Sequence, residues 1–175
     1  MPDLLIALLV CVTAAVAEGL CAGRDPMAKL RAIRQPSWSP PSWLWVLIGL
    51  AWYALCFTAL LRLLPHWPRH PAPVLLLAAL MLANGGANLL QFRLERLDLA
   101  FFFLLPYWLL LAAFLSAACP LDRLTCVLFA IYAAYQLYAA AWGYSLWRMN
   151  PPPAAGGRSA TNPVSRRSDE PGPLA

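Results

Sequence analysis

Long apolar runs, separated by short polar or proline-rich segments, dominate the hydrophobic pattern of this 175-residue chain. A helix needs about 20 mostly apolar residues to span the hydrocarbon core of a membrane. Five stretches reach that scale, with approximate bounds of 4–23, 43–64, 71–92, 99–121 and 124–147. The pattern predicts an all-α fold, an integral membrane bundle of five transmembrane helices that forms one domain over residues 1–150.

The first of these stretches shares one feature with a signal peptide, because Ala15-Val16-Ala17 has the small-x-small form of a cleavage site. A signal peptide begins with a positive region, whereas this stretch follows Asp3 and contains no Lys or Arg. Its apolar character also continues past the cleavage motif to Ala22. We therefore expect it to be retained as the first spanning helix.

A segment rich in proline and tryptophan lies directly before the second stretch and reads Pro36-Ser37-Trp38-Ser39-Pro40-Pro41-Ser42-Trp43. Proline fixes φ and pushes the preceding residue towards extended backbone, so residues 36–41 are expected to be non-helical. Trp43 then begins a helix at the membrane interface, where tryptophan is enriched. The pattern predicts a stiff lid beside the membrane that holds Trp38 in a set direction.

Composition agrees with a membrane protein, because 61% of the residues are hydrophobic and 12% are charged. Soluble domains carry about 25% charged residues. Residues 151–175 differ from the rest, since they are rich in Pro, Gly, Ser and Arg. Such a segment cannot bury enough apolar surface to fold, so a disordered cytoplasmic tail is predicted there.

The basic residues predict an orientation. With five spans, ten of the thirteen Lys and Arg fall on the face that holds the carboxy terminus. The positive-inside rule then predicts a multi-pass protein of the bacterial inner membrane, with the amino terminus outside and the carboxy terminus in the cytoplasm. Topology and anionic lipid explain the net charge of +5. We therefore expect the lipid bilayer as a partner and do not expect a nucleic acid.

Side chains suited to catalysis or metal binding are sparse. The five cysteines are scattered, and we interpret them as small packing residues without a disulfide framework. His66 and His70 share a short loop, interpreted as a solvated connector with a metal site as the alternative. Glu18 and Arg62 approach the spans only near their ends. Without a P-loop, an activated nucleophile or a zinc motif, we assign no catalytic residue, no metal ligand and no obligatory cofactor.

Three amide side chains recur along the third predicted span. Asn84, Asn88 and Gln91 stand at i, i+4 and i+7, a spacing that places them on one side of a helix. They either form hydrogen bonds to neighbouring helices or supply the orienting polar groups of an apolar ligand pocket. Gly85 and Gly86 leave room for another backbone, so this span is expected to be central in the bundle.

One face of the fifth predicted span combines aromatic and polar residues at helical spacings of three, four and seven. These residues are Tyr132, Tyr135, Gln136, Trp142 and Gly143. Such a stripe either packs in the core or forms a wall that stacks on a flat ligand, with the tyrosine hydroxyls as polar groups.

The order of several motifs resembles one family. The chain combines five spans, a Trp-x-Pro-Pro in the first loop, Asn84 in the third span and the ending Tyr144-Ser-Leu-Trp147-Arg148-Met-Asn150. From about residue 36 to 150 it is similar to the TspO/MBR family, the tryptophan-rich sensory proteins that include the translocator protein. The resemblance implies a five-helix bundle, often a homodimer, whose pocket under the first loop binds porphyrins, sterols or synthetic aromatic ligands.

The resemblance can be followed position by position. The residues that match family motifs are Pro36, Trp38, Pro40, Pro41, Tyr53, Asn84, Phe92, Tyr132, Tyr144, Trp147, Arg148 and Asn150. Five positions depart from the family motifs. Ala87 and Tyr135 stand in place of tryptophans, Phe103 in place of an acidic residue, Ile131 in place of a proline, and Gly143 in place of an asparagine. Some bacterial relatives degrade porphyrin in light with tryptophans of the lid and the fifth helix, and Tyr135 stands at the latter position.

The leading hypothesis is a membrane receptor or carrier that binds a small, flat hydrophobic ligand, a porphyrin, a haem-type group or another tetrapyrrole, under the first loop. The alternatives are a light-dependent porphyrin-degrading enzyme and a divergent structural or regulatory subunit without ligand. Arg34, Arg93 or Arg96 would pair with ligand carboxylates at the cytoplasmic mouth. The residues expected to contact the ligand are Trp38, Pro40, Pro41, Tyr53, Asn84, Asn88, Gln91, Tyr132, Tyr135 and Trp142.

Overall fold

The computed structural model describes residues 2–151, and all regular elements in that range are helical. They are α1 (Pro2–Ala22), α2 (Pro26–Ala32), α3 (Ser42–Leu63), η1 (Leu64–His66), α4 (Ala72–Asn88), η2 (Leu89–Arg93), α5 (Leu97–Phe102), α6 (Leu104–Ala118) and α7 (Arg123–Met149). Five continuous helical stretches are long and apolar enough to cross a membrane. The predicted all-α membrane bundle is therefore confirmed, and the tail predicted for residues 151–175 lies, after its first residue, outside the described part.

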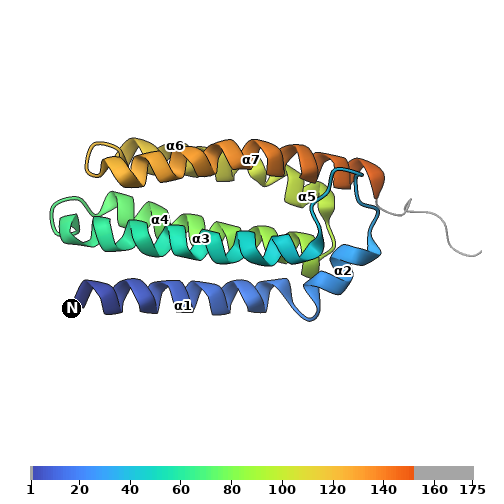
Figure 1. Cartoon of the computed structure of the whole chain (residues 1–175), viewed down its shortest axis with the longest axis horizontal. Coiled ribbons are helices and arrows are strands. Elements are labelled where there is room, and N and C mark those ends of the chain that lie inside the picture. The colour runs from blue at the N-terminus through green and yellow to red at the C-terminus, as the bar shows by residue number, and fades with distance from the viewer. Residues whose placement is uncertain (1, 152–175) are drawn as a thin grey trace, which may run out of the picture.

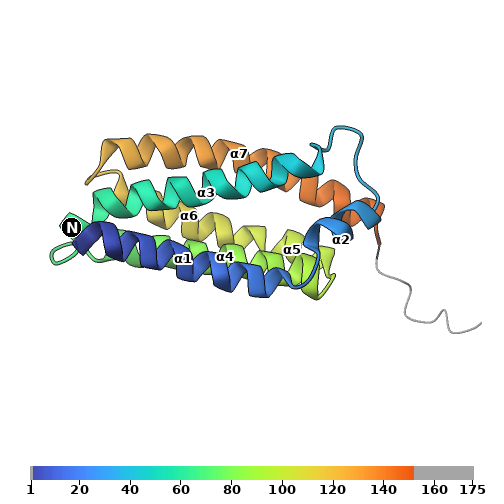
Figure 2. The same ribbon diagram turned by 60° about the horizontal axis from the view of Figure 1, so that its bottom comes forward.

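The long helices lie side by side along the long axis of the molecule (Figure 1, Figure 2). α4 packs against α1, α3 and α6, while α7 packs against α3, α5 and α6. A methyl group added at Gly85 of α4 would lie 3.6 Å from the Cα of Glu18 in α1. That distance is an ordinary van der Waals contact, so the two backbones lie close together at this level. α4 takes the predicted central position in the bundle.

Two spans are less regular than the sequence predicted. The fourth is broken at Phe103, between α5 and α6, shortly before Pro106 in the first turn of α6. Proline lacks a backbone N–H, and its ring clashes with the carbonyl of the residue four positions earlier, here Phe102. The third span ends in the π-helical turn η2, where the N–H of Leu94 donates to the carbonyl of Leu89 at 2.9 Å.

Two buried clusters fill the bundle and leave a gap between them. The larger lies in the half nearer the amino terminus and includes Cys11, Trp52, Cys56, Leu77, Phe114 and Phe129. The smaller lies near the first loop and joins Leu30, Trp142 and Leu146. Many apolar side chains on the outside stay more than half exposed, such as Leu50 and Leu105, as expected for surfaces that face lipid.

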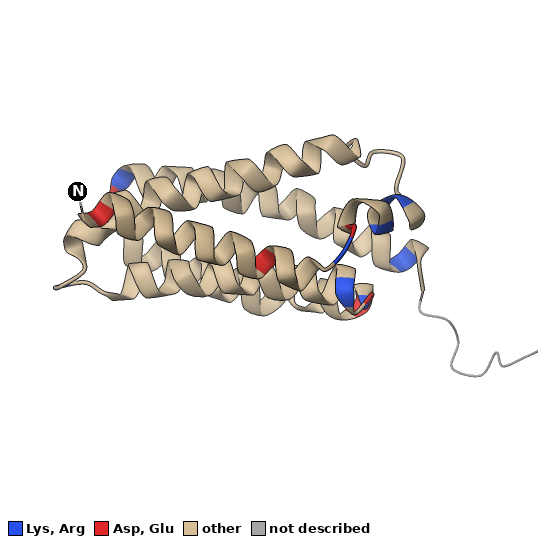
Figure 3. Cartoon of the chain, turned by 90° about the horizontal axis from the view of Figure 1, so that it is seen from below, with Lys and Arg blue, Asp and Glu red and all other residues tan. Residues whose placement is uncertain are grey.

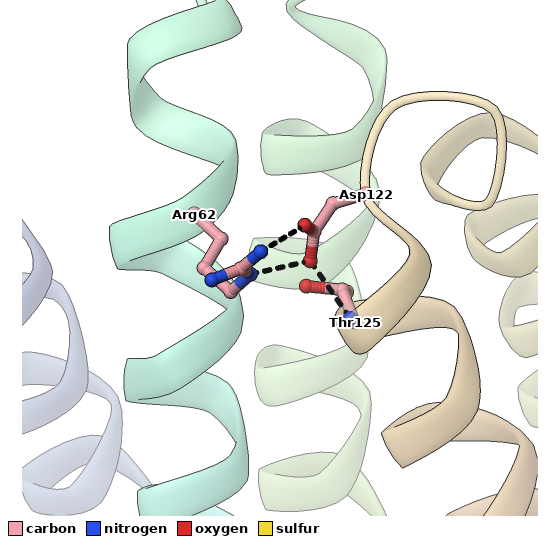
Figure 4. A network of polar contacts seen from close by, with 3 residues as sticks. All are labelled: Arg62, Asp122 and Thr125. Atoms are coloured by element: carbon pink, nitrogen blue, oxygen red, sulfur yellow. Dashed lines mark hydrogen bonds and ion pairs between the residues drawn. The ribbon is translucent and has the colours of Figure 1, made fainter.

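An ion pair closes the end of the bundle that carries the amino terminus. Arg62 of α3 donates two hydrogen bonds to the carboxylate of Asp122, at 2.7 and 2.6 Å. Asp122 is buried and also accepts the backbone N–H of Thr125 at 2.8 Å, as the N-cap of α7 (Figure 4). One carboxylate thereby joins the end of α3 to the start of α7.

A disulfide bond joins Cys119 and Cys126 across the α6–α7 turn, with Cα atoms 4.7 Å apart. The interpretation of all five cysteines as packing residues is therefore wrong for these two. The first lies just after α6 and the second in the first turn of α7, so the turn at Asp122 brings them together. Their spacing along the chain does not reveal this, because both fall within or beside apolar runs.

We predict that Asp122→Ala lowers the free energy of unfolding by about 1–3 kcal/mol, because it removes an N-cap and a partly exposed ion pair. Denaturation in a neutral detergent measures the change. Arg123→Ala is the matched control, since this exposed neighbour takes no part in the ion pairs of the described residues. An equal loss in both variants would contradict the assignment.

The same pair makes stability depend on acid. Arg62 holds the pKa of Asp122 below its ordinary value of 3.8, so the ionised form is favoured by the fold. This stabilisation is complete above the ordinary pKa and is lost as the pH falls through the lowered folded-state pKa. The difference in melting temperature between the wild type and Asp122→Ala should therefore shrink below about pH 4.

Cysteine counting checks the disulfide. In denatured but unreduced protein, iodoacetamide should label the three free cysteines, Cys11, Cys21 and Cys56, and all five only after reduction. Intact-mass spectrometry reads the number of labels directly. Cys119→Ser should expose Cys126 and give four labels without reduction, whereas five labels on the unreduced wild type would exclude the bond.

Candidate functional site

A pocket of about 450 Å³ fills the gap between the two buried clusters. Its floor includes Trp52, Tyr107 and Tyr132, from the edge of the larger cluster, and its roof includes Leu30 and Trp142 from the smaller one. Helices α1 to α7 and the turn η2 all contribute lining residues. The volume falls within the range of about 300–1,000 Å³ that is typical of small-molecule sites.

Glu18 is the carboxylate of this pocket. Figure 3 shows the charged residues gathered at the two ends of the bundle, with one acidic position set back along a helix. The Glu18 side chain accepts the hydroxyl of Tyr53 at 2.5 Å and the side-chain amide of Asn88 at 2.7 Å. These two bonds join α1, α3 and α4 at the wall of the pocket.

A second polar network lies on the floor. The hydroxyls of Tyr107 and Tyr132 are 2.6 Å apart, and the side-chain amide of Gln136 donates to the hydroxyl of Tyr132. Trp52 stacks on Tyr132 with ring centroids 4.6 Å apart. Side chains from α3, α6 and α7 are thus fixed against one another, which gives the pocket a rigid aromatic base with a few polar atoms.

The short helix α2, which the sequence analysis did not predict, forms part of the roof through Pro26, Met27 and Leu30. It follows a turn in which Gly23 and Asp25 both have positive φ, 76° and 52°. The ammonium group of Lys29 donates to the carbonyl of Phe92 at 2.7 Å and pairs with Glu95 at 2.8 Å. These contacts hold α2 against the end of η2.

The proline-rich segment is non-helical over residues 36–41, as predicted. Trp38 is 46% exposed and packs edge-on against Tyr138, with ring centroids 5.5 Å apart. It lies outside the pocket lining, and so do Pro40 and Pro41. The segment reaches the pocket indirectly, because the hydroxyl of Ser39 accepts the indole N–H of Trp142 at 3.0 Å.

Asn150 fastens this segment to the end of α7. Its side-chain oxygen accepts the backbone N–H of Arg34 at 2.9 Å, and its amide nitrogen donates to the carbonyl of Arg34 at 3.0 Å. The same nitrogen also donates to the carbonyl of Leu146 at 2.9 Å. One side chain therefore reproduces a backbone pairing between two segments that are 116 residues apart.

A basic hollow adjoins the pocket beside α1. It shares Gly19 and Ala22 with the pocket lining and adds Arg24, Lys29 and Arg93. Of the three arginines expected at the cytoplasmic mouth, only Arg93 lines this hollow. Arg96 instead pairs with Asp98, and the backbone of Arg34 is held by Asn150.

A sequence model of the TspO/MBR family matches residues 7–148. The chain belongs to the TspO/MBR family. A comparison with curated proteins finds no match. Membership agrees with five membrane-spanning helices, whereas the homodimer implied by the resemblance stays a prediction.

The pocket brings together most of the residues expected from the sequence of this TspO/MBR protein. Seven of those expected to contact the ligand line it, namely Tyr53, Asn84, Asn88, Gln91, Tyr132, Tyr135 and Trp142. Asn88 fits both of the roles considered for the three amides, because it forms a hydrogen bond to Glu18 of α1 and also lines the pocket. Glu18 and Tyr107 also line the pocket and were not among the expected contact residues. An acidic residue in an apolar run could have indicated Glu18, because such residues in membrane proteins are often functional.

The departures from the family motifs also gather here. Ala87, Phe103, Tyr135 and Gly143 line the pocket, whereas Ile131 is 63% exposed on the outside. A methyl group added at Gly143 would meet no atom within 4 Å. The sequence therefore differs from the family pattern at positions that set the shape of the pocket.

Asn150→Ala should loosen the proline-rich segment without unfolding the bundle. The variant loses three hydrogen bonds, each worth about 0.5–1.5 kcal/mol. Hydrogen exchange of a peptide over residues 33–41 should then speed up by about tenfold or more, while α4 stays protected. Arg148→Ala, an exposed position two residues earlier, is the control, and equal exchange in both variants would contradict the tether.

Proposed function

We propose that this TspO/MBR protein is a membrane receptor or carrier that binds a flat hydrophobic ligand, a porphyrin or another tetrapyrrole, in the pocket between the two buried clusters. The observation that carries the proposal is a cavity of about 450 Å³ with aromatic walls on several helices and only a few polar groups. Sites of that kind bury most of a ligand and orient it through a small number of hydrogen bonds.

The aromatic walls favour a planar ligand. Trp45 of α3 and Trp142 of α7 meet with ring centroids 4.3 Å apart at the roof, and Trp52 stacks on Tyr132 at the floor. Flat ring systems gain from offset stacking on such side chains in addition to the burial of apolar area. A ligand with a wide aromatic face would use both surfaces, since all four rings line the same cavity.

The basic hollow supports a ligand that carries carboxylates. Arg24, Lys29 and Arg93 line the hollow, which shares Gly19 and Ala22 with the pocket lining. Carboxylates form strong charge-assisted hydrogen bonds with arginine and lysine. A porphyrin with acidic side chains would place its ring in the aromatic pocket and its carboxylates towards the basic hollow.

We further propose that the end with α2 faces the cytoplasm of a bacterial cell and that the amino terminus lies outside. Seven of the ten basic residues in the described range lie in or next to α2, η2 and the end of α7, which agrees with the positive-inside rule. The Cys119–Cys126 disulfide lies at the opposite end, and disulfides persist in oxidising compartments such as the periplasm. Two independent features therefore support one orientation.

Blocking the cavity tests the binding proposal. Gly143→Leu should weaken protoporphyrin binding by at least about tenfold, because the added side chain would enter space that is open in the wild type. Binding is measured in the dark as quenching of intrinsic tryptophan fluorescence in detergent, corrected for absorption by the ligand. Saturable quenching of the wild type is the expected result.

Ala141→Leu is the matched control, since it adds a larger group to an exposed position of the same helix outside the pocket lining. It should bind protoporphyrin like the wild type, and both variants should keep the wild-type melting temperature within a few degrees. Absence of saturable quenching in the wild type, or equal affinity in Gly143→Leu, would overturn the proposed function.

A further inference from the structure

We infer that Glu18 makes the pocket selective for ligands that present a nitrogen-bound proton, above all a protonated ring nitrogen or amine. The inference rests on the proposed function, because it names the chemistry of a ligand in that same pocket. It follows from the acceptor capacity of Glu18, from the lack of a counter-ion in the described residues, and from the space beside the carboxylate.

The carboxylate retains free acceptor capacity. Each of its oxygens accepts one hydrogen bond, from Tyr53 and from Asn88, whereas an ionised carboxylate offers about four lone-pair sites. One further N–H donor on each oxygen can therefore be accommodated without breaking the existing contacts.

The charge of Glu18 has no cationic partner among the described residues. The ion pairs there use Glu95, Asp122 and Asp98, all of which lie at the ends of the helices. A carboxylate within a membrane protein is costly unless it is paired or strongly hydrogen-bonded. A ligand cation would supply the missing partner, and its attraction to the carboxylate is stronger in an apolar cavity than in water.

The surroundings leave room for such a group. Gly19 follows Glu18 in α1, and Gly49 precedes Tyr53 by one turn in α3, and both line the pocket. A methyl group added at either glycine would meet no atom within 4 Å. Tyr53 and Trp52 also line this cavity, and aromatic faces attract cations in addition to stacking on flat rings.

Two flat probes of nearly equal shape test the inference on the full chain in a neutral detergent at pH 8. The ring nitrogen of 9-aminoacridine is protonated at this pH, whereas that of acridine is not. The wild type should bind 9-aminoacridine at least about tenfold more tightly than acridine. Fluorescence anisotropy follows the first probe, and competition against it gives the affinity for the second.

Glu18→Gln should weaken 9-aminoacridine binding by about ten- to hundredfold and change acridine binding by no more than about twofold. Glu18→Asp keeps the charge and should retain a preference for the protonated probe. Asp3→Asn is the matched control, because this carboxylate lies in the first turn of the same helix and outside the pocket lining, and the variant should bind both probes like the wild type.

A merely structural role for Glu18, as the link between α1, α3 and α4, predicts a different result. Glu18→Gln would then weaken both probes equally or neither, and either outcome overturns the inference. If that variant does not fold, equal affinity of the wild type for the two probes, or binding of neither, overturns it. Protoporphyrin binding by the same wild-type sample separates these failures from failure of the proposed function.

Discussion

A carboxylate inside an apolar bundle has to be hydrogen-bonded, and here that requirement fixes where three helices meet. Glu18 accepts hydrogen bonds from Tyr53 of α3 and Asn88 of α4, and Gly85 of α4 lies beside the backbone of α1 at the same level. Apolar packing alone specifies helix positions weakly in lipid, because lipid tails are as apolar as leucine. The polar contacts supply this specificity, and they join three of the helices that line the pocket.

The two ends of the bundle are closed by different means. At the amino-terminal end a disulfide and the buried carboxylate of Asp122 join α3, α6 and α7 directly. At the other end α2 covers the pocket and the proline-rich segment lies outside its lining, and Lys29 and Asn150 hold them through contacts that are largely exposed. Exposed ion pairs and hydrogen bonds contribute little individually. The contacts that hold α2 and the proline-rich segment are therefore individually weaker than those that close the amino-terminal end.

The number of helices could be predicted from the sequence because the length of an apolar run is a property of the chain alone. The shared faces of Asn84 and Asn88, and of Tyr132 and Tyr135, likewise follow from helical spacing, and all four line the pocket. What could not be predicted depends on contacts between elements. Examples are the disulfide across a turn and the roof formed by α2 rather than by Trp38.

Glu18 illustrates the same limit and gives it a functional meaning. Its position near the end of an apolar run indicates how deep the side chain lies in the membrane. The sequence does not indicate which neighbour the side chain faces, and the packing of α1 on α4 places it at the pocket. Ala87 and Gly143 line the same cavity with small side chains where the family pattern has larger ones. A fold does not determine a ligand. Space gained at these positions, together with a carboxylate in the wall, would change which flat molecules bind without changing the bundle that holds them.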